Sequence, residues 1–355
     1  MRIDNDVKLD FKDVLIRPKR SDMKSRNDVA LERTFGFLHS KTTWTGIPIV
    51  AANMDSSGTF EMARELSKHK MITALTKYYS LEELKKFFKS FNNPDYVAFS
   101  MGIRNGDVEK LDGLIKAKLQ NKFRFVCMDV PNGYLEEFVN YVGEVRKKLP
   151  NHIIIAGNVV TNEMTEQLLL NGADIVKVGI GSGSACTTRL KTGVGYPQLS
   201  AVIECADAAH GISSHHNSCG LIMSDGGAVH PSCVSKAFAG GADFLMSGSL
   251  FSGYEESGGE TVVKEGKKYK EYYGSSSTKA QNKNYGGVKK YKTSEGRSLL
   301  IPHKGDIEEF VQDLLGSLRS TATYIGARRL KEFSRRATFI KVNRQLNDSL
   351  AVFED

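Results

Sequence analysis

Eight short runs of apolar, β-favouring residues recur along this 355-residue chain, and helical patterns fill most of the gaps between them. The runs cover residues 47–51, 71–75, 97–101, 125–128, 153–156, 175–178, 221–224 and 244–247. Each run is almost wholly apolar rather than alternating, which is typical of parallel strands covered on both faces. The pattern therefore predicts an α/β fold of the TIM (β/α)8 barrel type.

The helices of such a barrel are expected at residues 59–68, 81–91, 107–120, 134–148, 161–171, 196–209, 231–239 and 306–318. A long excursion at 253–305 precedes the last of them, and the chain closes with a C-terminal tail. Within the excursion, 261–264 and 267–273 predict a β-hairpin that turns at Glu265-Gly266, and the polar stretch 274–287 is expected to be mobile. No linker divides the chain, so we expect residues 1–355 to form a single catalytic domain with 253–305 as a flap within it.

The net charge of +8 is concentrated in this flap, where nine lysines and one arginine stand against three glutamates between Lys264 and Arg297. A basic segment among Gly and Ser suits a flap over phosphorylated ligands. A solvated surface loop is the plainer alternative. Nucleic-acid binding is a third, because tyrosines interleave with the lysines and can stack on bases. Because the positive charge is confined to one loop, nucleic-acid binding is the weakest of the three interpretations. We therefore expect no nucleic-acid partner.

Composition narrows the class of protein further. The chain is 40% hydrophobic and 25% charged, a globular balance, and no run reaches the roughly 18 apolar residues that a membrane helix needs. Acidic residues stand at the start, where a secretory signal needs an apolar stretch. The five cysteines are scattered without a C-x-x-C pair, which disfavours a disulfide framework or a zinc site. We expect a cytoplasmic protein with no membrane partner.

Glycine-rich turns follow the sixth, seventh and eighth runs, at the edge where barrels of this type carry their active sites. Ser224-Asp225-Gly226-Gly227 and Met246-Ser247-Gly248-Ser249 follow the last two runs, where backbone N–H groups commonly hold a phosphate. Glycine after a strand can also be a plain tight turn. The two turns together favour phosphate binding.

The turn after the sixth run places Cys186 among three glycines and just before Thr187, Thr188 and Arg189. A loop thiol beside an arginine and backbone donors suits a nucleophile. The same glycines allow carbonyls to turn inward as a cage for a monovalent cation. Burial as a small hydrophobe fits Cys127 and Cys205, which lie in apolar patterns, but it fits Cys186 poorly.

The segment 184–189, followed by 192–198, resembles the catalytic loop of the IMP dehydrogenase/GMP reductase family. Segments 9–15, 156–161, 224–227 and 337–340 are similar to the same family, so the resemblance covers nearly the whole chain. Segments 129–134, 199–211 and 291–296 resemble its GMP reductase branch. Residues 75–97 leave room for one helix only, whereas the dehydrogenases usually insert a regulatory unit there, and the chain lacks their Arg-Tyr flap pair. A dehydrogenase without that insertion is the alternative.

The resemblance implies NADPH-dependent reductive deamination of GMP to IMP and ammonia in purine nucleotide salvage. Cys186 would attack C2 of the guanine, and Thr188 and Glu295 would handle protons on the departing amine. The residues implied for ribose and phosphate are Asp225, Gly226, Gly227, Gly248 and Ser249. Those implied for the purine are Gly274, Ser275, Ser276, Lys292, Ser294 and Gly296.

The resemblance also implies a cofactor site, a potassium site and a homotetramer. The residues implied for NADPH are Lys77, Asp129, Val130, Pro131, Ile180 and Gly181. Those that would reach a neighbouring subunit's cofactor are Ser25, Arg26, Ser320, Thr321, Ala322 and Thr323. The K⁺ loop would consist of Gly181, Gly183, Cys186 and Arg189.

Five positions depart from the family's usual pattern. Ser182 stands for Pro, Ala185 for Val or Ile, Ser249 for Gly, Ser275 for Met and Lys292 for Arg. Lys292 lacks the planar guanidinium with which an arginine makes two parallel hydrogen bonds. Segment 211–219 is longer than usual in the family and contains His215 and His216. Two adjacent histidines on a polar loop are more often solvated than bound to a metal ion. A family fold that binds purine nucleotides without turnover stays a second hypothesis, against which the presence of Cys186, Thr188 and Glu295 together argues.

Overall fold

The computed structural model describes residues 3–213, 218–289, 291, 293–343 and 345. Eight parallel strands close into a barrel, with the first strand, β4, paired to the last, β11. They are β4 (Ile49–Ala51), β5 (Ile72–Ala74), β6 (Val97–Met101), β7 (Phe125–Asp129), β8 (Ile153–Val159), β9 (Ile175–Val178), β10 (Leu221–Asp225) and β11 (Phe244–Ser247). The predicted barrel is confirmed, and three of the eight runs have the predicted bounds.

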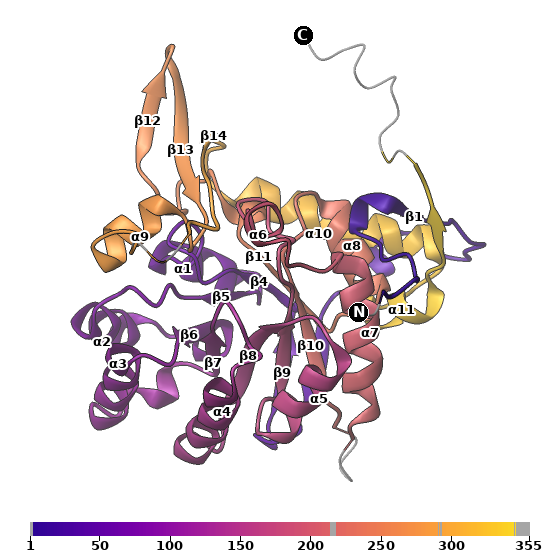
Figure 1. The fold of residues 1–355 in the computed structure, drawn as a ribbon. Coiled ribbons are helices and arrows are strands. Elements are labelled where there is room, and N and C mark those ends of the chain that lie inside the picture. The colour runs from indigo at the N-terminus through magenta and orange to yellow at the C-terminus, as the bar shows by residue number, and fades with distance from the viewer. Residues whose placement is uncertain (1–2, 214–217, 290, 292, 344, 346–355) are drawn as a thin grey trace.

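Eight helices cover the barrel, one after each strand (Figure 1). They are α1 (Phe60–Lys68), α2 (Leu81–Ser90), α3 (Asn105–Lys116), α4 (Glu136–Lys148), α5 (Asn162–Leu170), α7 (Gln198–Gly211), α8 (Pro231–Ala239) and α10 (Glu308–Ile325). Capping side chains set the starts of two of them. The Thr59 hydroxyl accepts from the Met62 N–H in α1. In α2 the Ser80 hydroxyl accepts from the Glu83 N–H, and the Glu83 carboxylate accepts from the Ser80 N–H. Helix α10 runs seven residues past its predicted end, because the apolar stripe continues through Leu318, Ala322 and Ile325 to Gly326.

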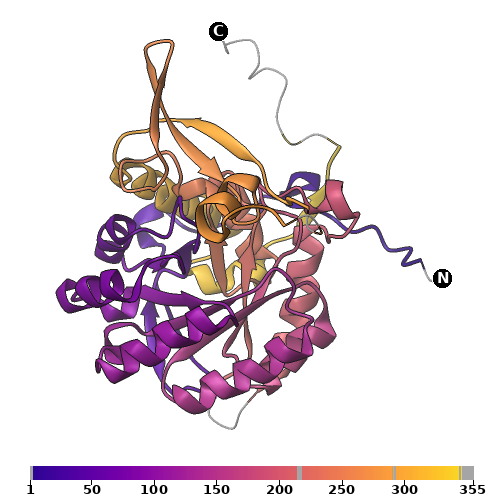
Figure 2. The same cartoon turned by 60° about the vertical axis from the view of Figure 1, so that its left-hand side comes forward.

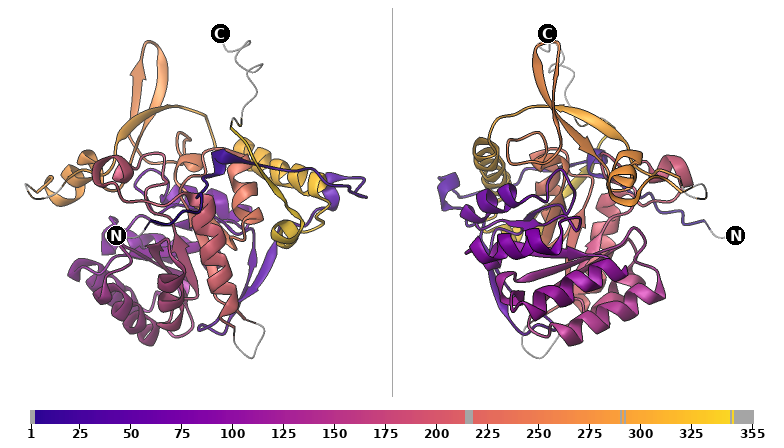
Figure 3. Two further views of the ribbon diagram at one scale, coloured as in Figure 1. Left: turned by 45° about the vertical axis from the view of Figure 1, so that its right-hand side comes forward. Right: turned by 90° about the vertical axis from the view of Figure 1, so that its left-hand side faces the viewer.

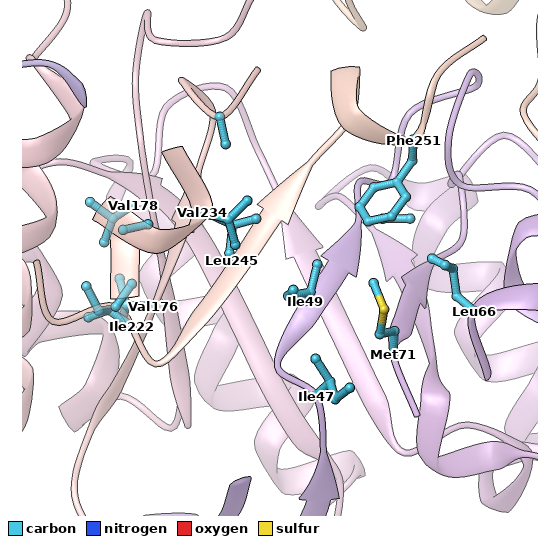
Figure 4. Packing of buried hydrophobic residues seen from close by; sticks show 14 of the residues in the cluster. Ile47, Ile49, Leu66, Met71, Val176, Val178, Ile222, Val234, Leu245 and Phe251 are labelled. Atoms are coloured by element: carbon cyan, nitrogen blue, oxygen red, sulfur yellow. The ribbon is translucent and has the colours of Figure 1, made fainter. Parts of the chain in front are cut away.

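Successive residues of each strand alternate between two apolar layers. Val176, Val178, Ile222 and Leu245 face outward and pack under the helices, as Figure 4 shows for Leu245 beside Val234 of α8. The residues between them face the barrel interior and form a second cluster that includes Phe125, Cys127, Ile175, Leu221, Met223 and Phe244. Burial on both faces explains why the strands are apolar without alternation.

An antiparallel hairpin of β2 (Arg33–Gly36) and β3 (Thr43–Gly46) closes the N-terminal end of the barrel. Trp44 lies 5.7 Å from the ring of Phe125 and 5.5 Å from that of Phe244, the first residues of their strands. Phe35 stacks on Phe244 at 4.6 Å. No element was predicted before residue 47, so the hairpin is an addition to the predicted fold.

The excursion between β11 and α10 forms a three-stranded sheet of β12 (Thr261–Lys264), β13 (Lys267–Tyr273) and β14 (Ser298–Pro302). The β12–β13 hairpin has the predicted bounds and projects away from the barrel (Figures 2 and 3). The polar stretch 274–287, which was expected to be mobile, contains the helix α9 (Thr278–Tyr285). Its start is capped by the Ser277 hydroxyl, and it ends at Gly286 in a left-handed conformation.

The two ends of the described chain meet. Strand β1 (Val14–Ile16) pairs antiparallel with β15 (Phe339–Lys341), next to α11 (Phe333–Arg336). A short helix, α6 (Thr188–Thr192), follows β9. The 3-10 helices are η1 (Phe11–Asp13), η2 (Arg26–Asp28), η3 (Pro94–Tyr96), η4 (Gln120–Lys122), η5 (Ser249–Phe251) and η6 (Leu330–Glu332).

Candidate active site

A cleft of about 200 Å³ opens at the C-terminal ends of the strands, under the base of the flap. Its walls combine the turn after β9, the glycine turns after β10 and β11, and flap residues from β13 onward. Predicted residues that line it are Asp129, Gly183, Cys186, Thr188, Asp225, Gly226, Gly227, Gly248, Ser249, Gly274, Ser275, Ser276 and Glu295. The structure therefore brings together segments that are far apart in the sequence.

Cys186, Thr188 and Glu295 form a continuous chain of hydrogen bonds. The Cys186 thiol donates to the Thr188 hydroxyl over 3.1 Å, and that hydroxyl donates to Oε2 of Glu295 over 2.8 Å. Thr188 and Glu295 are 107 residues apart. A hydroxyl both accepts and donates, so Thr188 can pass a proton between the thiol side of the cleft and the carboxylate.

Backbone pairing holds Glu295 against the thiol loop. The Thr187 N–H donates to the Glu295 carbonyl over 2.8 Å, and the Arg297 N–H donates to the Ala185 carbonyl over 3.0 Å. The Arg297 guanidinium adds two donors to the Ser184 carbonyl, at 2.9 and 3.1 Å. The distance from Thr188 to Glu295 is therefore fixed by main-chain contacts on both sides.

The floor of the cleft carries three charged side chains that meet inside the barrel. The ammonium of Lys177 contacts the carboxylate of Asp129 and lies 3.0 Å from Oδ2 of Asp225. Asn158 donates to the same Asp225 oxygen over 2.9 Å. Burial alone raises the pKa of Asp129, but Lys177 and Lys77 outweigh it and lower that pKa to about 2. The carboxylates of Asp129 and Asp225 therefore line the cleft, and both contact the buried ammonium of Lys177.

The glycine turns after β10 and β11 leave backbone exposed to the cleft. Gly226 and Gly227 have φ of +95° and +75°, where a side chain would be strained. A Cβ on Gly248 would lie 2.5 Å from the Met54 sulfur, so a side chain at this position would require Met54 to move. The Ser249 hydroxyl is turned away to the Ala228 carbonyl at 3.1 Å. The exposed N–H groups of such turns are suited to a phosphate.

The flap forms the opposite wall, where the purine was expected. Ser276 is tied to Ser294 and Glu295: its carbonyl accepts from the Glu295 N–H at 3.2 Å and the Ser294 hydroxyl at 3.3 Å. Gly296 lies against Cys186 in an antiparallel bridge. Lys292 lies outside the described residues, as do His215 and His216.

A second cleft, of about 380 Å³, adjoins the first and shares Thr188 and Glu295 with it. Pro131 and Ile180, both expected at the cofactor, line it together with Val160 and Val194. Asp129 lies in the first cleft, and Val130 is buried beside it. Lys77 is close enough to Asp129 to lower its pKa. A flat, partly apolar ring is suited to this position, with one edge against Thr188 and Glu295.

The residues expected to reach a neighbouring subunit's cofactor lie on the flank, apart from both clefts. Arg26, Ser320 and Thr321 line a cavity of about 450 Å³ between η2, α8 and α10. Ser25 caps η2, and the Thr323 hydroxyl bonds to the Ser320 carbonyl at 2.7 Å. The side chain of Ala322 is buried in the core face of α10, so only its backbone is left for a ligand.

The expected cation loop is present as a turn, but its arginine is already engaged. Arg189 forms an ion pair with Asp10 at 2.9 Å and donates to the Tyr196 carbonyl at 2.6 Å. The Gly183 carbonyl accepts from the Cys186 N–H, and Gly181 has a φ of +78°. Within the described residues, no group of three or more His, Cys, Asp or Glu side chains is placed to hold a metal ion. A cation here would depend on backbone carbonyls.

Sequence reasoning missed Lys177, Asn158 and Tyr272. Lys177 interrupts an otherwise apolar strand, and a charge in such a run was the available signal. Asn158 lies in segment 156–161, for which the resemblance implied no role. Tyr272 lines the cleft from β13, with its hydroxyl 3.3 Å from that of Ser184, and burial raises its pKa. All five cysteines are unpaired, and Cys127 and Cys205 are buried as expected. No described helix has the length and hydropathy to cross a membrane.

Comparisons with known proteins agree on one family. The sequence model described as "IMP dehydrogenase / GMP reductase domain" matches residues 8–347. Human GMP reductase 1 is 57% identical over 349 residues, which cover 98% of each chain. Human GMP reductase 2 is 56% identical over 348 residues, 97% of each chain. GMP reductase from Caenorhabditis elegans is 54% identical over 358 residues, which cover 99% of the present chain and 97% of the worm protein.

Proposed function

Because this chain belongs to the IMP dehydrogenase/GMP reductase family, we propose that it is an oxidoreductase that converts GMP to IMP and ammonia with NADPH as the reductant. The observation that carries the proposal is the hydrogen-bonded chain from Cys186 through Thr188 to Glu295 at the junction of two clefts. One cleft suits a nucleotide monophosphate, and the other suits a nicotinamide ring.

Cys186 is the nucleophile in the proposed mechanism. Its sulfur forms a bond to C2 of the guanine, and the exocyclic amine leaves as ammonia, which gives a covalent adduct at C2. Amines leave poorly unless they are protonated, so a general acid is needed at this step. The Thr188 hydroxyl, 3.1 Å from the sulfur and 2.8 Å from Glu295, is placed to relay that proton. NADPH, when bound, supplies the hydride that reduces C2 and allows the C–S bond to break.

The remaining contacts orient the nucleotide. The N–H groups of Gly226, Gly227, Gly248 and Ser249 hold the phosphate, and Asp225 accepts from the ribose hydroxyls. Within the described residues, Oδ1 of Asp225 accepts no hydrogen bond, whereas Oδ2 is taken by Lys177 and Asn158. Gly274, Ser275, Ser276, Ser294 and Gly296, with Lys292, are assigned to the purine.

The cofactor is proposed to lie in the second cleft, against Pro131 and Ile180. Lys77, Asp129, Val130 and Gly181 are assigned to it by the family resemblance, and Asp129 faces it from the adjoining first cleft. Its remote end would reach a neighbouring chain in a homotetramer, at Ser25, Arg26 and 320–323. The flank cavity that contains Arg26, Ser320 and Thr321 supports this arrangement. We also propose a K⁺ ion held by carbonyls of Gly181, Gly183 and Cys186, and a cytoplasmic location, where the unpaired Cys186 thiol stays reduced.

The decisive measurement is NADPH oxidation, followed at the absorbance band of the reduced nicotinamide, with GMP as the second substrate. We expect IMP and ammonia in equal amounts with the NADPH consumed. Formation of XMP from IMP and NAD at a comparable rate would show a dehydrogenase instead. Tight GMP binding without NADPH oxidation would show a nucleotide-binding protein that has lost turnover. Light scattering of the purified protein should give the mass of four chains.

A further inference from the structure

Lys177 is a deeply buried charged side chain that contacts two carboxylates of the cleft and that the mechanism above does not use. It lies in the middle of β9 with 2% of its side chain exposed, and it faces the barrel interior above Ile175. Its ammonium contacts Asp129 at the end of β7 and Asp225 at the end of β10. These carboxylates retain 22% and 21% exposure and line the cleft.

The arrangement is not a simple ion pair. Two carboxylates share one ammonium, so the group carries a net negative charge at the bottom of a cleft. A buried cation without compensation costs several kcal/mol, and so does a pair of facing carboxylates without a cation between them. Each member of the group is therefore strongly constrained by the other two.

We propose that Lys177 is a positioning residue that couples the nucleotide site to the cofactor site, by fixing Asp225 on one side and Asp129 on the other with a single ammonium. The proposal rests on the proposed function, because that function assigns Asp225 to the ribose of GMP and Asp129 to the cofactor. When one carboxylate moves towards its ligand, its ion pair with the ammonium weakens. The ammonium then interacts more strongly with the other carboxylate.

Lys177 positions the two carboxylates as a permanent positive charge and does not exchange its proton. Burial lowers its pKa, but the two carboxylates outweigh burial and raise it far above neutral pH, so the ammonium stays protonated. The titratable groups that face the trio are Cys127 on β7, Lys77 after β5, Tyr78 beside it and Tyr272 on β13. The pKa of Cys127 is raised to about 12 by burial, and those of both tyrosines are also raised, so these three stay neutral near pH 7.

The test compares wild type with Lys177→Met, Asp129→Asn and the double variant, by calorimetric titration of GMP and by NADPH oxidation at pH 6 and pH 8. Removal of the ammonium alone leaves two carboxylates facing each other, and the pKa of one then rises towards neutral. We expect Lys177→Met to lose at least about a hundredfold in kcat/KM. We also expect its ratio of activity at pH 8 to that at pH 6 to rise about tenfold above the wild-type ratio.

The double variant tests whether Asp129→Asn strengthens or weakens GMP binding once the ammonium is absent. Asp129→Asn in the Lys177→Met background removes the repulsion, so the double variant should bind GMP about tenfold more tightly than Lys177→Met, while NADPH use stays poor. If Lys177 only fills space, Asp129→Asn adds a further loss or none. Weaker or equal GMP binding by the double variant therefore overturns the proposal, as does an unchanged pH ratio in Lys177→Met.

The unfolding temperature tests the repulsion between the two carboxylates without any ligand. The double variant should unfold at a higher temperature than Lys177→Met, and a lower unfolding temperature, or a double variant that does not fold, overturns the proposal. Lys236→Met is the matched control: Lys236 is also 2% exposed, but its ammonium donates to the Phe11 carbonyl at 3.0 Å. That variant should lose stability and keep the wild-type pH ratio. Wild-type turnover of GMP is measured first, so failure of the proposed function is recognised separately.

Discussion

The two ends of the barrel hold their carboxylates in opposite ways. At the N-terminal end, Asp174 and Asp243 each precede a strand and are saturated by donors. Oδ2 of Asp174 accepts from Arg146 at 2.5 Å and from the Ile154 N–H at 3.1 Å. At the C-terminal end, Asp129 and Asp225 share one ammonium and keep lone pairs towards the cleft.

This difference separates stability from function along the same eight strands. The inward positions of β7 run from Phe125 in the aromatic cluster through Cys127 to Asp129 in the cleft. Those of β10 run from Leu221 through Met223 to Asp225. Because inward residues recur at every second position, one strand contributes to a dry core at one end and to a polar site at the other. Substitutions at the two ends should therefore have separable effects.

The largest effect is expected at the thiol. Cys186→Ala should reduce turnover of GMP by at least about a thousandfold and leave GMP affinity nearly unchanged, because the sulfur acts in the chemical steps while the phosphate and ribose contacts supply affinity. Steady-state assays and calorimetric titration measure the two quantities. Cys205→Ala, at a buried cysteine of α7, is the matched control and should keep turnover. Retained turnover in Cys186→Ala excludes the covalent mechanism.

Glu295→Gln is expected to have the next largest effect, and a selective one. The substitution keeps the shape and removes the carboxylate that accepts from Thr188, so deamination should slow by about 10²–10⁴-fold. Hydride transfer from IMP to NADP, which involves no amine, should suffer less. Rapid-mixing measurements of each half-reaction separate the two. Equal losses would show that Glu295 only holds the flap against residues 185–187.

Trp44→Ala tests the opposite end. Trp44 is 2% exposed, packs among Phe35, Phe125 and Phe244, and donates to the Asp95 carbonyl at 2.7 Å. We expect a loss of about 3–5 kcal/mol in the free energy of unfolding, since the cavity adds to the lost burial. The kcat and KM of the folded fraction should stay near wild type. Trp44→Phe, which keeps most of the ring volume, should cost less. A large fall in kcat at full folding would contradict the separation of the two ends.

The barrel itself was predictable because its signal is periodic and repeated. The runs at 175–178 and 244–247 each directly follow an aspartate and directly precede a glycine, so their bounds were correct. The β2–β3 hairpin was missed because Phe35 and Trp44 stand among polar residues and give no sustained alternation. Helix α9 was missed because it is short and polar, with one buried residue, Ala280, and so shows no apolar stripe. Its Ser277 cap and the hydrogen bond between the Tyr285 and Tyr78 hydroxyls at 3.0 Å add support that the sequence pattern does not show.

The candidate site was less accessible to sequence reasoning. Cys186 could be singled out from its own loop, but no local pattern joins it to Glu295, and that pairing came from family resemblance. The shared ammonium of Lys177 was missed for a related reason. Its partners lie on β7 and β10, two strands and one strand away in the barrel, so the sequence could mark Lys177 as an unusual charge in an apolar strand but could not identify the two carboxylates that it contacts.

The smallest predicted effect concerns pH and again the N-terminal end. His210 on α7 lies 2.8 Å from Oδ2 of Asp243, and this hydrogen bond raises the pKa of His210 above its usual range. A raised pKa in the folded state means that charged His210 stabilises the fold at pH values below its unfolded pKa of about 6.5. That contribution is lost as the pH rises through the folded pKa. Because 41% of the His210 side chain is exposed, solvent screening limits the effect to at most about 1 kcal/mol.

His210→Gln should therefore lower the free energy of unfolding at pH 5.5, as measured by denaturant titration, and leave it unchanged at about pH 9, where the wild-type imidazole is neutral. Arg33→Met is the control, because Arg33 contacts the same carboxylate at 3.2 Å and stays charged throughout, so its loss should be similar at both pH values. Neither variant should alter the pH dependence of GMP turnover, since Asp243 lies at the start of β11 and the cleft at its end. A shifted activity profile in His210→Gln would mean that charge at the closed end of the barrel reaches the site, and that the two ends are electrostatically coupled.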